Sequence, residues 1–198
     1  MLDLLPALIG FAFVSSITPG PNNLMLLASG ANFGLRRSVP HMLGISIGHS
    51  VMVILVGLGL IGIFDAWPHS YTLLKWASVA YLLWLAWKIA SADPTPPGGT
   101  PRARPMTFLG AALFQWVNPK AWYMALTAIS AYLAEHTLTG VVMVALVFAA
   151  TNLPSITVWT VLGEQLRRWL TSPARMRAFN VTMAVFLVAT LWPILRGH

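Results

Sequence analysis

Two early stretches of the chain, residues 4–35 and 38–64, contain no Asp, Glu, Lys or Arg. A helix needs about 20 mostly apolar residues to cross a bilayer, because each residue adds about 1.5 Å along a hydrocarbon path of about 30 Å. The composition agrees, since 57% of the 198 residues are hydrophobic and 9% are charged, against about 25% charged in a typical soluble domain. The sequence therefore predicts an all-α, polytopic membrane protein and excludes soluble enzymes and disordered chains.

Further apolar runs extend this interpretation to six transmembrane helices. The predicted spans are about 4–26, 40–62, 69–89, 107–131, 139–162 and 178–195. Residues 32–37 form a polar linker, after which Pro40 is expected to open the second span, because proline is favoured in the first turn of a helix. Prolines and glycines gather in residues 91–105, which predicts a non-helical linker. Because the spans use most of the chain, residues 1–198 are predicted to form a single transmembrane domain.

Positive charges alternate between the predicted connectors. Nine of the twelve Lys and Arg residues lie in the first, third and fifth connectors, two lie on the opposite side, and Lys120 lies within the fourth span. Cytoplasmic loops of membrane proteins are enriched in Lys and Arg. We therefore expect three cytoplasmic connectors and both termini outside. This distribution also explains the net charge of +7 by contact with a lipid bilayer, without a nucleic-acid partner.

Three predicted spans precede the proline-rich linker and three follow it. The chain thus divides into repeat 1 (about 1–90), the cytoplasmic linker (about 91–105) and repeat 2 (about 106–198). An odd number of crossings in each half forces the halves into opposite orientations. Inverted repeats of this kind occur in transporters, whose substrate lies near the midplane where broken helices meet. The pattern predicts matching breaks in helices 1 and 4.

Both halves carry a break of the expected kind. The residues concerned are Pro19, Gly20, Pro21 and Asn22 in the first span and Asn118, Pro119 and Lys120 in the fourth. A proline inside a helix costs about 3 kcal/mol or more, and in lipid the freed backbone groups need partners in the protein or in a water-filled cavity. We predict that these residues bind substrate; the alternative is a structural kink satisfied by neighbours. A further break is predicted at residues 152–155.

Lys120 lies about halfway along the fourth span, where a lysine costs about 2.5–3.5 kcal/mol on insertion scales. All five acidic residues fall at span ends or in connectors, so we expect no carboxylate beside it. We predict that an anionic group of the substrate, such as a carboxylate, pairs with Lys120, helped by the N-terminal dipole of a broken helix. The alternative is that Lys120 caps carbonyl groups freed at the break.

Four further side chains are candidates for coupling or for the wall of a pocket: His49, Asn152, Trp116 and Trp122. Histidine titrates near neutral pH and suits proton coupling, whereas the alternative for His49 is a packed neutral imidazole. Packing or interface anchoring is the alternative for the two tryptophans, which flank the second break. The chain has no cysteine and no visible cluster of metal ligands, so no metal site and no cofactor are predicted.

These features resemble the lysine exporter (LysE) family, in its threonine/homoserine exporter (RhtB-type) branch. The resemblance covers essentially the whole chain and is carried by Thr18–Asn22, Gly30–Arg37, Gly44–Gly48 and Asn118–Ala121. It implies export of amino acids or derivatives from the bacterial cytoplasm across the inner membrane, driven by an ion gradient, with protons as the expected ion. The family motifs fall on Pro19, Gly20, Pro21, Asn22, Asn118, Pro119 and Lys120.

The expected substrate is a neutral, zwitterionic amino acid, because a cationic side chain such as that of lysine would lack a counter-ion in the membrane. Other functions stay open. A channel or metal-ion permease would be supported by a loop rich in His or acidic residues, and an intramembrane enzyme would need a clustered acid, base and nucleophile. A passive scaffold would leave two costly matched breaks unexplained. A homodimer is a further arrangement that the sequence leaves open.

Overall fold

The computed structural model describes residues 4–67, 69–92, 104–133 and 137–196. Over these ranges every regular element is helical and no strand forms, so the predicted all-α class is confirmed. Four segments are long and apolar enough to cross a membrane: Leu35–Leu60, His69–Ala90, Leu138–Leu166 and Pro173–Arg196. They correspond to the second, third, fifth and sixth predicted spans.

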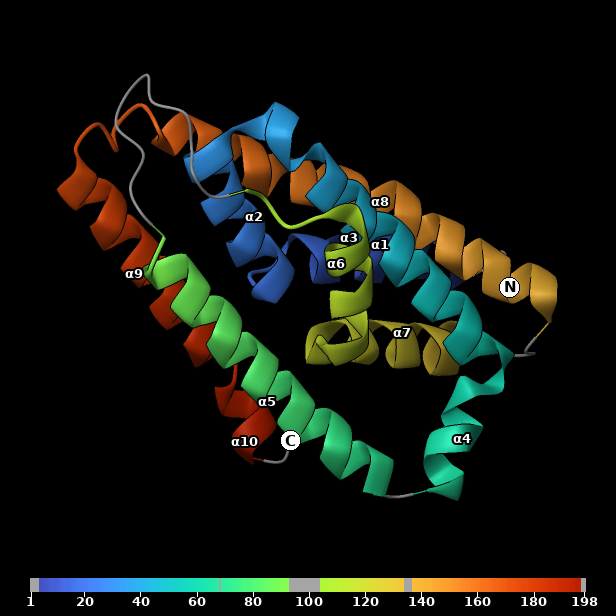
Figure 1. Cartoon of the computed structure of the whole chain (residues 1–198). Helices are drawn as coiled ribbons and strands as arrows, with labels where there is room; N and C mark the ends of the chain where they lie inside the picture. Colours follow the sequence, from blue (N-terminus) through green and yellow to red (C-terminus); the bar gives the residue numbers. More distant parts are fainter. Residues whose placement is uncertain (1–3, 68, 93–103, 134–136, 197–198) are drawn as a thin grey trace.

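The first and fourth predicted spans are each divided into two shorter helices (Figure 1). The first pair is α1 (Leu5–Ile17) and α2 (Pro21–Phe33); the second is α6 (Phe108–Phe114), extended by a 3-10 turn (Gln115–Val117), and α7 (Pro119–Tyr132). Pro21 and Pro119 open the second helix of each pair. At that position the missing amide costs no helical hydrogen bond and the fixed φ suits the helix. Both breaks therefore form where the prolines predict them.

The predicted break at residues 152–155 is wrong. α8 (Leu138–Leu166) runs through Pro154 without interruption. A single proline removes one helical hydrogen bond, and here no glycine or second proline stands beside it to unwind the chain further. The hydroxyls of Thr151 and Ser155 bond back to carbonyls of the preceding turn, so these side chains follow the continuous helix.

The expected start of the second span at Pro40 is also wrong. α3 (Leu35–Leu55) begins directly after Gly34, and Pro40 lies in its second turn. Gly34 has a φ of 80°, a conformation that favours glycine, and it replaces the whole predicted polar linker. Glu164 Oε1 accepts a hydrogen bond from Leu35 N at 3.1 Å. This contact satisfies a free amide of the first turn and sets a carboxylate at the positive end of the helix.

Short helical segments form the connection between α3 and α5 (His69–Ala90) and the end of the described chain. α3 passes through a π-helical turn (Val56–Leu60), kinked at Gly59 with a φ of 102°, into the short α4 (Ile61–Ala66) and then α5. α9 (Pro173–Ala189) is followed by α10 (Trp192–Arg196). Most of the predicted proline-rich linker, residues 93–103, lies outside the described residues.

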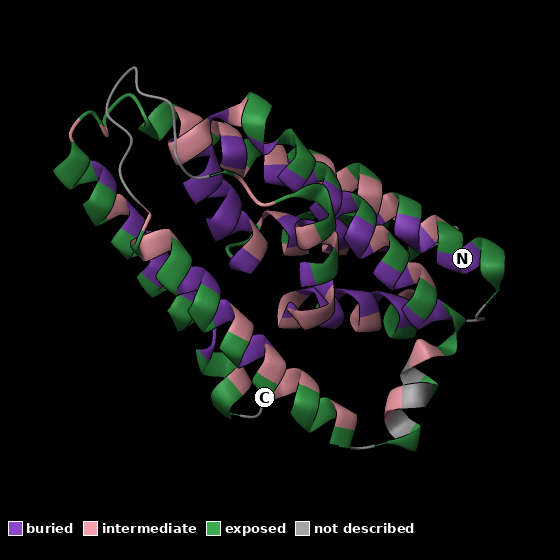
Figure 2. Cartoon of the chain, viewed as in Figure 1, coloured by how far each residue is buried: buried purple, intermediate pink, exposed green. Residues whose placement is uncertain are grey.

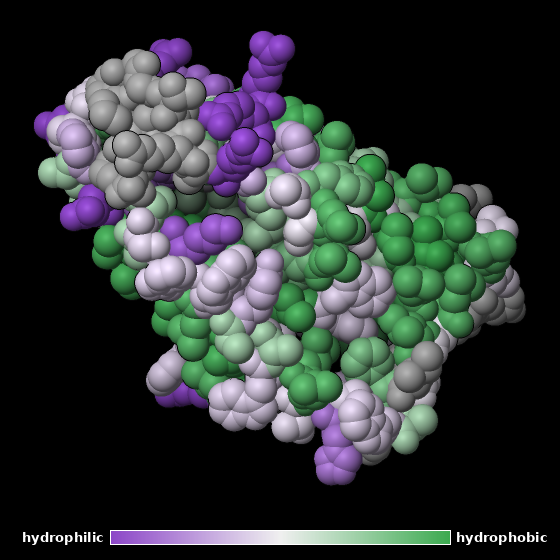
Figure 3. Space-filling model, viewed as in Figure 1, coloured by the Kyte–Doolittle hydropathy of each residue, from purple (hydrophilic) through white to green (hydrophobic). Residues whose placement is uncertain are grey.

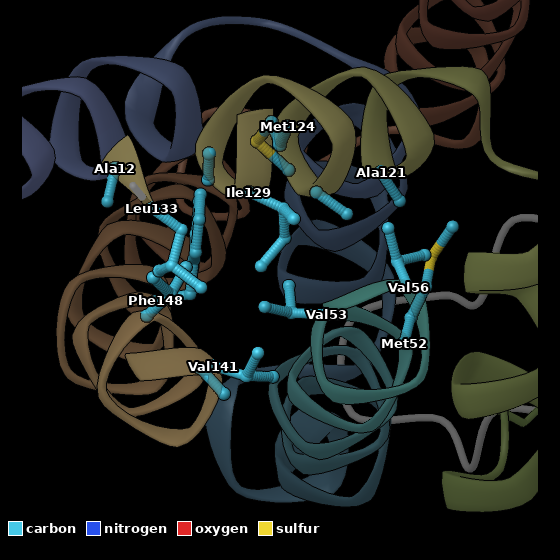
Figure 4. Close-up of a cluster of buried hydrophobic side chains, with 14 of the residues drawn as sticks. Ala12, Met52, Val53, Val56, Ala121, Met124, Ile129, Leu133, Val141 and Phe148 are labelled. Atoms are coloured by element: carbon cyan, nitrogen blue, oxygen red, sulfur yellow. The ribbon is translucent and has the colours of Figure 1, made fainter. Parts of the chain in front are cut away.

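The helix α8 is the centre of the packing. It packs against α1, α2 and α3, and α3 also packs against α6. α5 and α9 pack together along one flank (Figure 1), where α9 also packs against α2 and α5 against the 3-10 turn that follows α6. A large cluster of buried apolar side chains fills the space between α1, α3, α7 and α8, including Ala12, Val53, Ile129 and Phe148 (Figure 4).

The outer faces of the helices are apolar rather than polar. Buried residues line the helices of the centre, whereas α5, α8 and α9 present exposed faces (Figure 2). Trp87, Leu146 and Val185 are 66%, 63% and 58% exposed. On the face shown in Figure 3, apolar residues cover much of the surface and most hydrophilic residues gather at one end. Such a surface fits contact with lipid hydrocarbon around the bundle.

Glycines allow α2 and α8 to cross with their backbones in contact. A Cβ on Gly30 would lie 2.1 Å from Thr160 O, and a Cβ on Gly163 would lie 2.1 Å from Leu27 O. No side chain fits in either place. In lipid, helices associate through close van der Waals packing rather than a hydrophobic driving force, and small residues allow that packing. This crossing therefore fixes α2, and with it the first break, against α8.

The substitution Gly163→Ala is expected to lower the free energy of unfolding by about 1–3 kcal/mol, because the added methyl group forces two backbones apart. Thermal unfolding in detergent, followed by intrinsic tryptophan fluorescence, measures the effect. Gly10→Ala is the matched control, since a Cβ there meets nothing within 4 Å. Equal midpoints for the two variants would contradict the close crossing.

Candidate functional site

The carbonyl groups freed by the first break are satisfied by side chains. Each carbonyl of residues 15–19 accepts a hydrogen bond from a side chain. Asn23 on α2 donates from Nδ2 to Ser16 O and to Thr18 O, both at 2.8 Å. Trp159 on α8 donates from Nε1 to the last carbonyl of α1 at 2.9 Å. The carbonyl groups freed at the break are thus all hydrogen-bonded within the protein.

Lys120, at the second position of α7, reaches the first break from the other half of the chain. Its Nζ donates to Thr18 O at 2.7 Å, to Thr18 Oγ1 at 3.0 Å and to Pro19 O at 3.3 Å. Three acceptors match the three donors of an ammonium group. The carbonyl end of α1 is also the negative end of its dipole. The half-buried charge therefore lies where the local field favours it, without a carboxylate.

Gly20 makes this approach possible. A Cβ at that position would lie 2.6 Å from Lys120 Cδ and 3.1 Å from Lys120 Nζ. The missing side chain of Gly20 in the first break therefore leaves the space through which the Lys120 side chain of the second break extends. Two motifs that lie about a hundred residues apart in the sequence meet here at van der Waals distance.

The second break is capped from within. Asn118 is the N-cap of α7, and its Oδ1 accepts a hydrogen bond from Lys120 N at 3.2 Å. Asn118 is buried, being 1% exposed. An N-cap side chain satisfies one of the free amides at a helix start, so Asn118 fixes the direction in which α7, and thus Lys120, leaves the break.

A pair of amide side chains joins the two breaks. Asn22 Nδ2 donates to Gln115 Oε1 at 2.9 Å, and Gln115 Nε2 donates to Asn22 Oδ1 at 3.2 Å. Gln115 is fully buried and also donates to Ala111 O at 2.8 Å. The two breaks are therefore adjacent in space and are held together by two polar contacts, the amide pair and the Lys120 ammonium.

A small polar cavity, which we call the break cavity, lies between the breaks. It is lined by Ser15, Ser16, Gly20, Asn22, Asn23, Asn118, Lys120, Met124, Asn152 and Ile156. Its volume of about 20 Å³ is enough for about one water molecule and too small for an amino acid. Asn152 Oδ1 and Ser16 Oγ are buried there without a hydrogen-bond partner, so the cavity offers polar atoms that a ligand or water can satisfy.

Two larger hollows lie on opposite sides of the break cavity. The Lys120 groove, about 560 Å³, lies between α1 and α7 and is lined by residues that include Phe11, Thr18, Lys120, Tyr123 and Tyr132. The basic-end cavity, about 310 Å³, lies among α2, α3, α5 and α6 and is lined by residues that include Ser29, Asn32, His41, Trp84, Lys88 and Arg104. Because α1 and α7 leave the breaks toward one end and α2 and α6 toward the other, the breaks form the partition between the hollows.

The other candidates from the sequence lie around this centre. His49 is buried, with neither ring nitrogen hydrogen-bonded, and its ring meets Phe148 edge-on at 5.0 Å. Trp122 donates from Nε1 to Trp116 O at 2.9 Å and packs edge-on against Phe64 at 4.9 Å. These three side chains pack in or against the apolar cluster and line none of the three hollows, whereas Asn152 lines the break cavity.

Two residues of this region were not predicted from the sequence, namely Gln115 and Trp159. A lone glutamine inside the apolar run of the fourth span was the available signal for Gln115. Nothing in the sequence distinguished Trp159 from tryptophans at the lipid interface. In the part of the chain that the structure describes, no acidic side chain lines the three hollows and no three His, Cys, Asp or Glu residues are grouped to hold a metal.

Comparison with known proteins gives one family and a set of close relatives. A family model described as LysE type translocator matches residues 13–190. Proteins named cysteine/O-acetylserine efflux protein, from Escherichia coli (strain K12) and from Shigella flexneri, are each 32% identical over 189 residues, covering 93% of this chain and 94% of theirs. No solved structure matches.

The amide pair between the breaks is tested by a double-mutant cycle. Asn22→Ala leaves the buried Gln115 side chain without its partner, and such a loss costs about 1–3 kcal/mol of folding free energy. The double variant with Gln115→Ala is expected to lose less than the sum of the two single variants, with a coupling of at least about 0.5 kcal/mol. Additive losses in thermal unfolding would contradict direct contact between the breaks.

Proposed function

This chain belongs to the LysE type translocator family, and on that premise we propose that it exports amino acids or their derivatives from the bacterial cytoplasm by secondary active transport. The efflux of cysteine and O-acetylserine named for its relatives supports this class of cargo. Members of this family are efflux transporters and not enzymes, so the intramembrane enzyme considered from the sequence is excluded. The apolar helices and the family together make it a multi-pass membrane protein.

The proposed topology is six spans in two inverted repeats within a single domain, residues 1–198. Asn22 and Lys120 support it, because each is the second residue of a helix that begins with proline after a break. Each sends its side chain to the end of the first half-helix of the other repeat: Asn22 to Gln115, and Lys120 to Thr18. Equivalent residues making exchanged contacts are what an inverted repeat requires.

The proposed orientation sets the basic end of the molecule in the cytoplasm and both termini outside. Most of the described Lys and Arg residues lie at the start of α3, near the end of α5, before α6, directly after α8 and at the start of α9, and Glu164 of α8 bonds Leu35 at this same end. Positive charge of this kind stays on the cytoplasmic side. The basic-end cavity is then open toward the cytoplasm and the Lys120 groove toward the outside.

The observation that carries the substrate proposal is the contact of the Lys120 ammonium with the carbonyls of Thr18 and Pro19. It pairs one positive group with a set of freed acceptors, and a zwitterionic amino acid carries the complementary pair. The substrate carboxylate would take Lys120, and its ammonium would take the released carbonyls. The residues proposed for this site are Pro19, Gly20, Pro21, Asn22, Asn118, Pro119 and Lys120.

Alternating access is the proposed mechanism. With a break cavity of about 20 Å³, the site has to expand before an amino acid enters, and this expansion requires Lys120 to release the carbonyls. The hollows on either side provide routes to and from the site. A substrate that binds the expanded state more tightly shifts the population toward it, and the two halves then rock about the bound molecule. A homodimer stays a prediction that this mechanism does not require.

Proton coupling is proposed through His49. Its imidazole is buried in α3 without a hydrogen-bond partner, faces Phe148 of α8 and lies two turns beyond His41 on the same helix. Burying an imidazole without a partner is costly. A change in its protonation therefore favours one packing of α3 against α8 over another, which links a proton to the movement of the two repeats.

Counterflow in proteoliposomes loaded with O-acetyl-L-serine tests the export proposal and its substrate class. Unlabelled L-threonine or O-acetyl-L-serine inside the vesicles is expected to drive uptake of labelled O-acetyl-L-serine from outside. Internal L-lysine or L-arginine is not, because the site offers no anion for a second positive charge. Lys120→Met should reduce the rate at least tenfold, and Lys75→Met, a lysine at a span end, should not. A preference for the basic amino acids, or full activity of Lys120→Met, would overturn the site; flux without counterflow would indicate a channel.

The coupling proposal predicts that a pH gradient across the membrane accelerates efflux of the substrate and that a protonophore slows it. His49→Gln, which keeps a buried polar side chain, is expected to retain counterflow while losing the stimulation by the gradient. The measurement is efflux of labelled substrate from vesicles at fixed internal pH. Unchanged stimulation in His49→Gln would remove this histidine from the coupling mechanism.

A further inference from the structure

The basic-end cavity has the size of a ligand site and lies apart from the breaks. Its volume is about 310 Å³, at the lower end of the range of small-molecule pockets. Along α2 it extends from Met25 to Phe33, whereas the break cavity is lined by Asn22 and Asn23. Ser29, near its middle, lies seven residues beyond Asn22, which is about 10 Å along a helix.

Two contacts separate this cavity from the break cavity. One is the Asn22–Gln115 amide pair. The other is Phe114, which is buried beside Gln115 and stacks on Tyr81 of α5 with ring centroids 5.5 Å apart. A molecule in the basic-end cavity therefore lies on the cytoplasmic side of a closed partition.

His41 provides the cavity with an unused polar group. It is 2% exposed, lines the cavity, and has no hydrogen-bond partner at either ring nitrogen. The neighbouring polar groups are already engaged, since Ser29 bonds Ser38 and Asn32 bonds Asn180. Buried polar atoms are normally hydrogen-bonded, so the imidazole is a fully buried group in this wall that a polar ligand would satisfy.

The charges and the depth of the cavity specify the ligand further. Lys88 and Arg104 line it, and among the described lining residues there is no acid, so a carboxylate is favoured over a cation. Lys88 lies two residues before the end of α5, whereas His41 lies six residues, or about 9 Å, inside α3. The positive groups are thus near the mouth, and the imidazole lies deeper, beyond a wall that includes Trp84 and Leu85.

We propose that the basic-end cavity is a loading site for the exported amino acid, in which Lys88 and Arg104 hold the carboxylate and His41 hydrogen-bonds an uncharged polar side chain. This inference rests on the proposed export function. It makes His41 a specificity-determining residue that distinguishes a hydroxyl, thiol or ester side chain from an apolar one before the molecule reaches the breaks.

The absence of cysteine from the whole sequence allows a direct test. Ala28 lines the cavity and is 4% exposed, so Ala28→Cys introduces one thiol there with little change in volume. Inside-out vesicles are treated with a membrane-impermeant maleimide in the presence of L-threonine or its near-isostere L-valine. Threonine is expected to protect the thiol at about fivefold lower concentration than valine, the effect of about one hydrogen bond.

Three controls define the outcome. L-threonine methyl ester, which lacks the carboxylate, should not protect, and His41→Leu in the Ala28→Cys background should remove the preference for threonine. Thr171→Cys, exposed between α8 and α9 at the basic end and outside all three hollows, should label equally under every condition. If Ala28→Cys does not fold, Ala92→Cys at the same cavity serves in its place.

Protection that is equal for threonine and valine, or absent for both, would overturn the proposal. Blocking of the thiol by added phosphatidylglycerol but not by amino acid would assign the cavity to lipid and also overturn it. Counterflow, measured on the variant and on the unmodified chain, distinguishes failure of the loading site from failure of the export function. Active counterflow of the variant without protection of its thiol rejects the loading site alone. Absence of counterflow in the unmodified chain rejects the export function.

Discussion

The hydrogen bonds from the Lys120 ammonium to the Thr18 and Pro19 carbonyls stabilise both a half-buried positive charge and the carbonyl groups freed by a helix break. A lysine near the middle of a membrane span is costly, and so are carbonyl groups freed by a broken helix in hydrocarbon. Each satisfies the other here, at 2.7 Å and 3.3 Å. The contact also ties the second half of the chain to the first, because the donor and the acceptors come from opposite halves. The adjacency of the breaks and the separation of the two larger hollows both follow from it.

The same contact explains how a rigid partition can also be the proposed site. A zwitterion brings one carboxylate and one ammonium, so it can replace the lysine–carbonyl contact without leaving either side uncompensated. The amide pair of Asn22 and Gln115, which also joins the two halves of the chain, offers a second polar contact that can exchange in the same way. The proposed cycle is therefore an exchange between internal partners and substrate partners, and its energy balance depends on the difference between the two sets rather than on either alone.

Local stereochemistry made part of this structure predictable. Pro21 and Pro119 each follow the residue that caps the start of the next helix, Gly20 and Asn118, and the breaks form there as expected. A lone proline was less informative, because Pro40 and Pro154 are both accommodated inside continuous helices whose neighbours keep the helical path. The partner of Lys120 was not predictable as a contact, since it depends on how segments about a hundred residues apart pack. The alternative in which Lys120 caps freed carbonyls named its partner only in general terms. The space that Gly20 leaves for the lysine side chain could be seen only in the three-dimensional structure. The same holds for the unpartnered His41 in the wall of the basic-end cavity.

Solid-state NMR on the protein in lipid tests the central claim most directly. The chain has three lysines, Lys75, Lys88 and Lys120, so labelling with ζ-¹⁵N-lysine gives three ammonium signals, and Lys120→Arg identifies one of them. With saturating L-threonine labelled with ¹³C at its carboxyl group, the account predicts dipolar dephasing of the Lys120 signal, as expected for nitrogen and carboxyl carbon in direct contact. A Lys120 signal that stays undephased while the same sample exchanges threonine would contradict it.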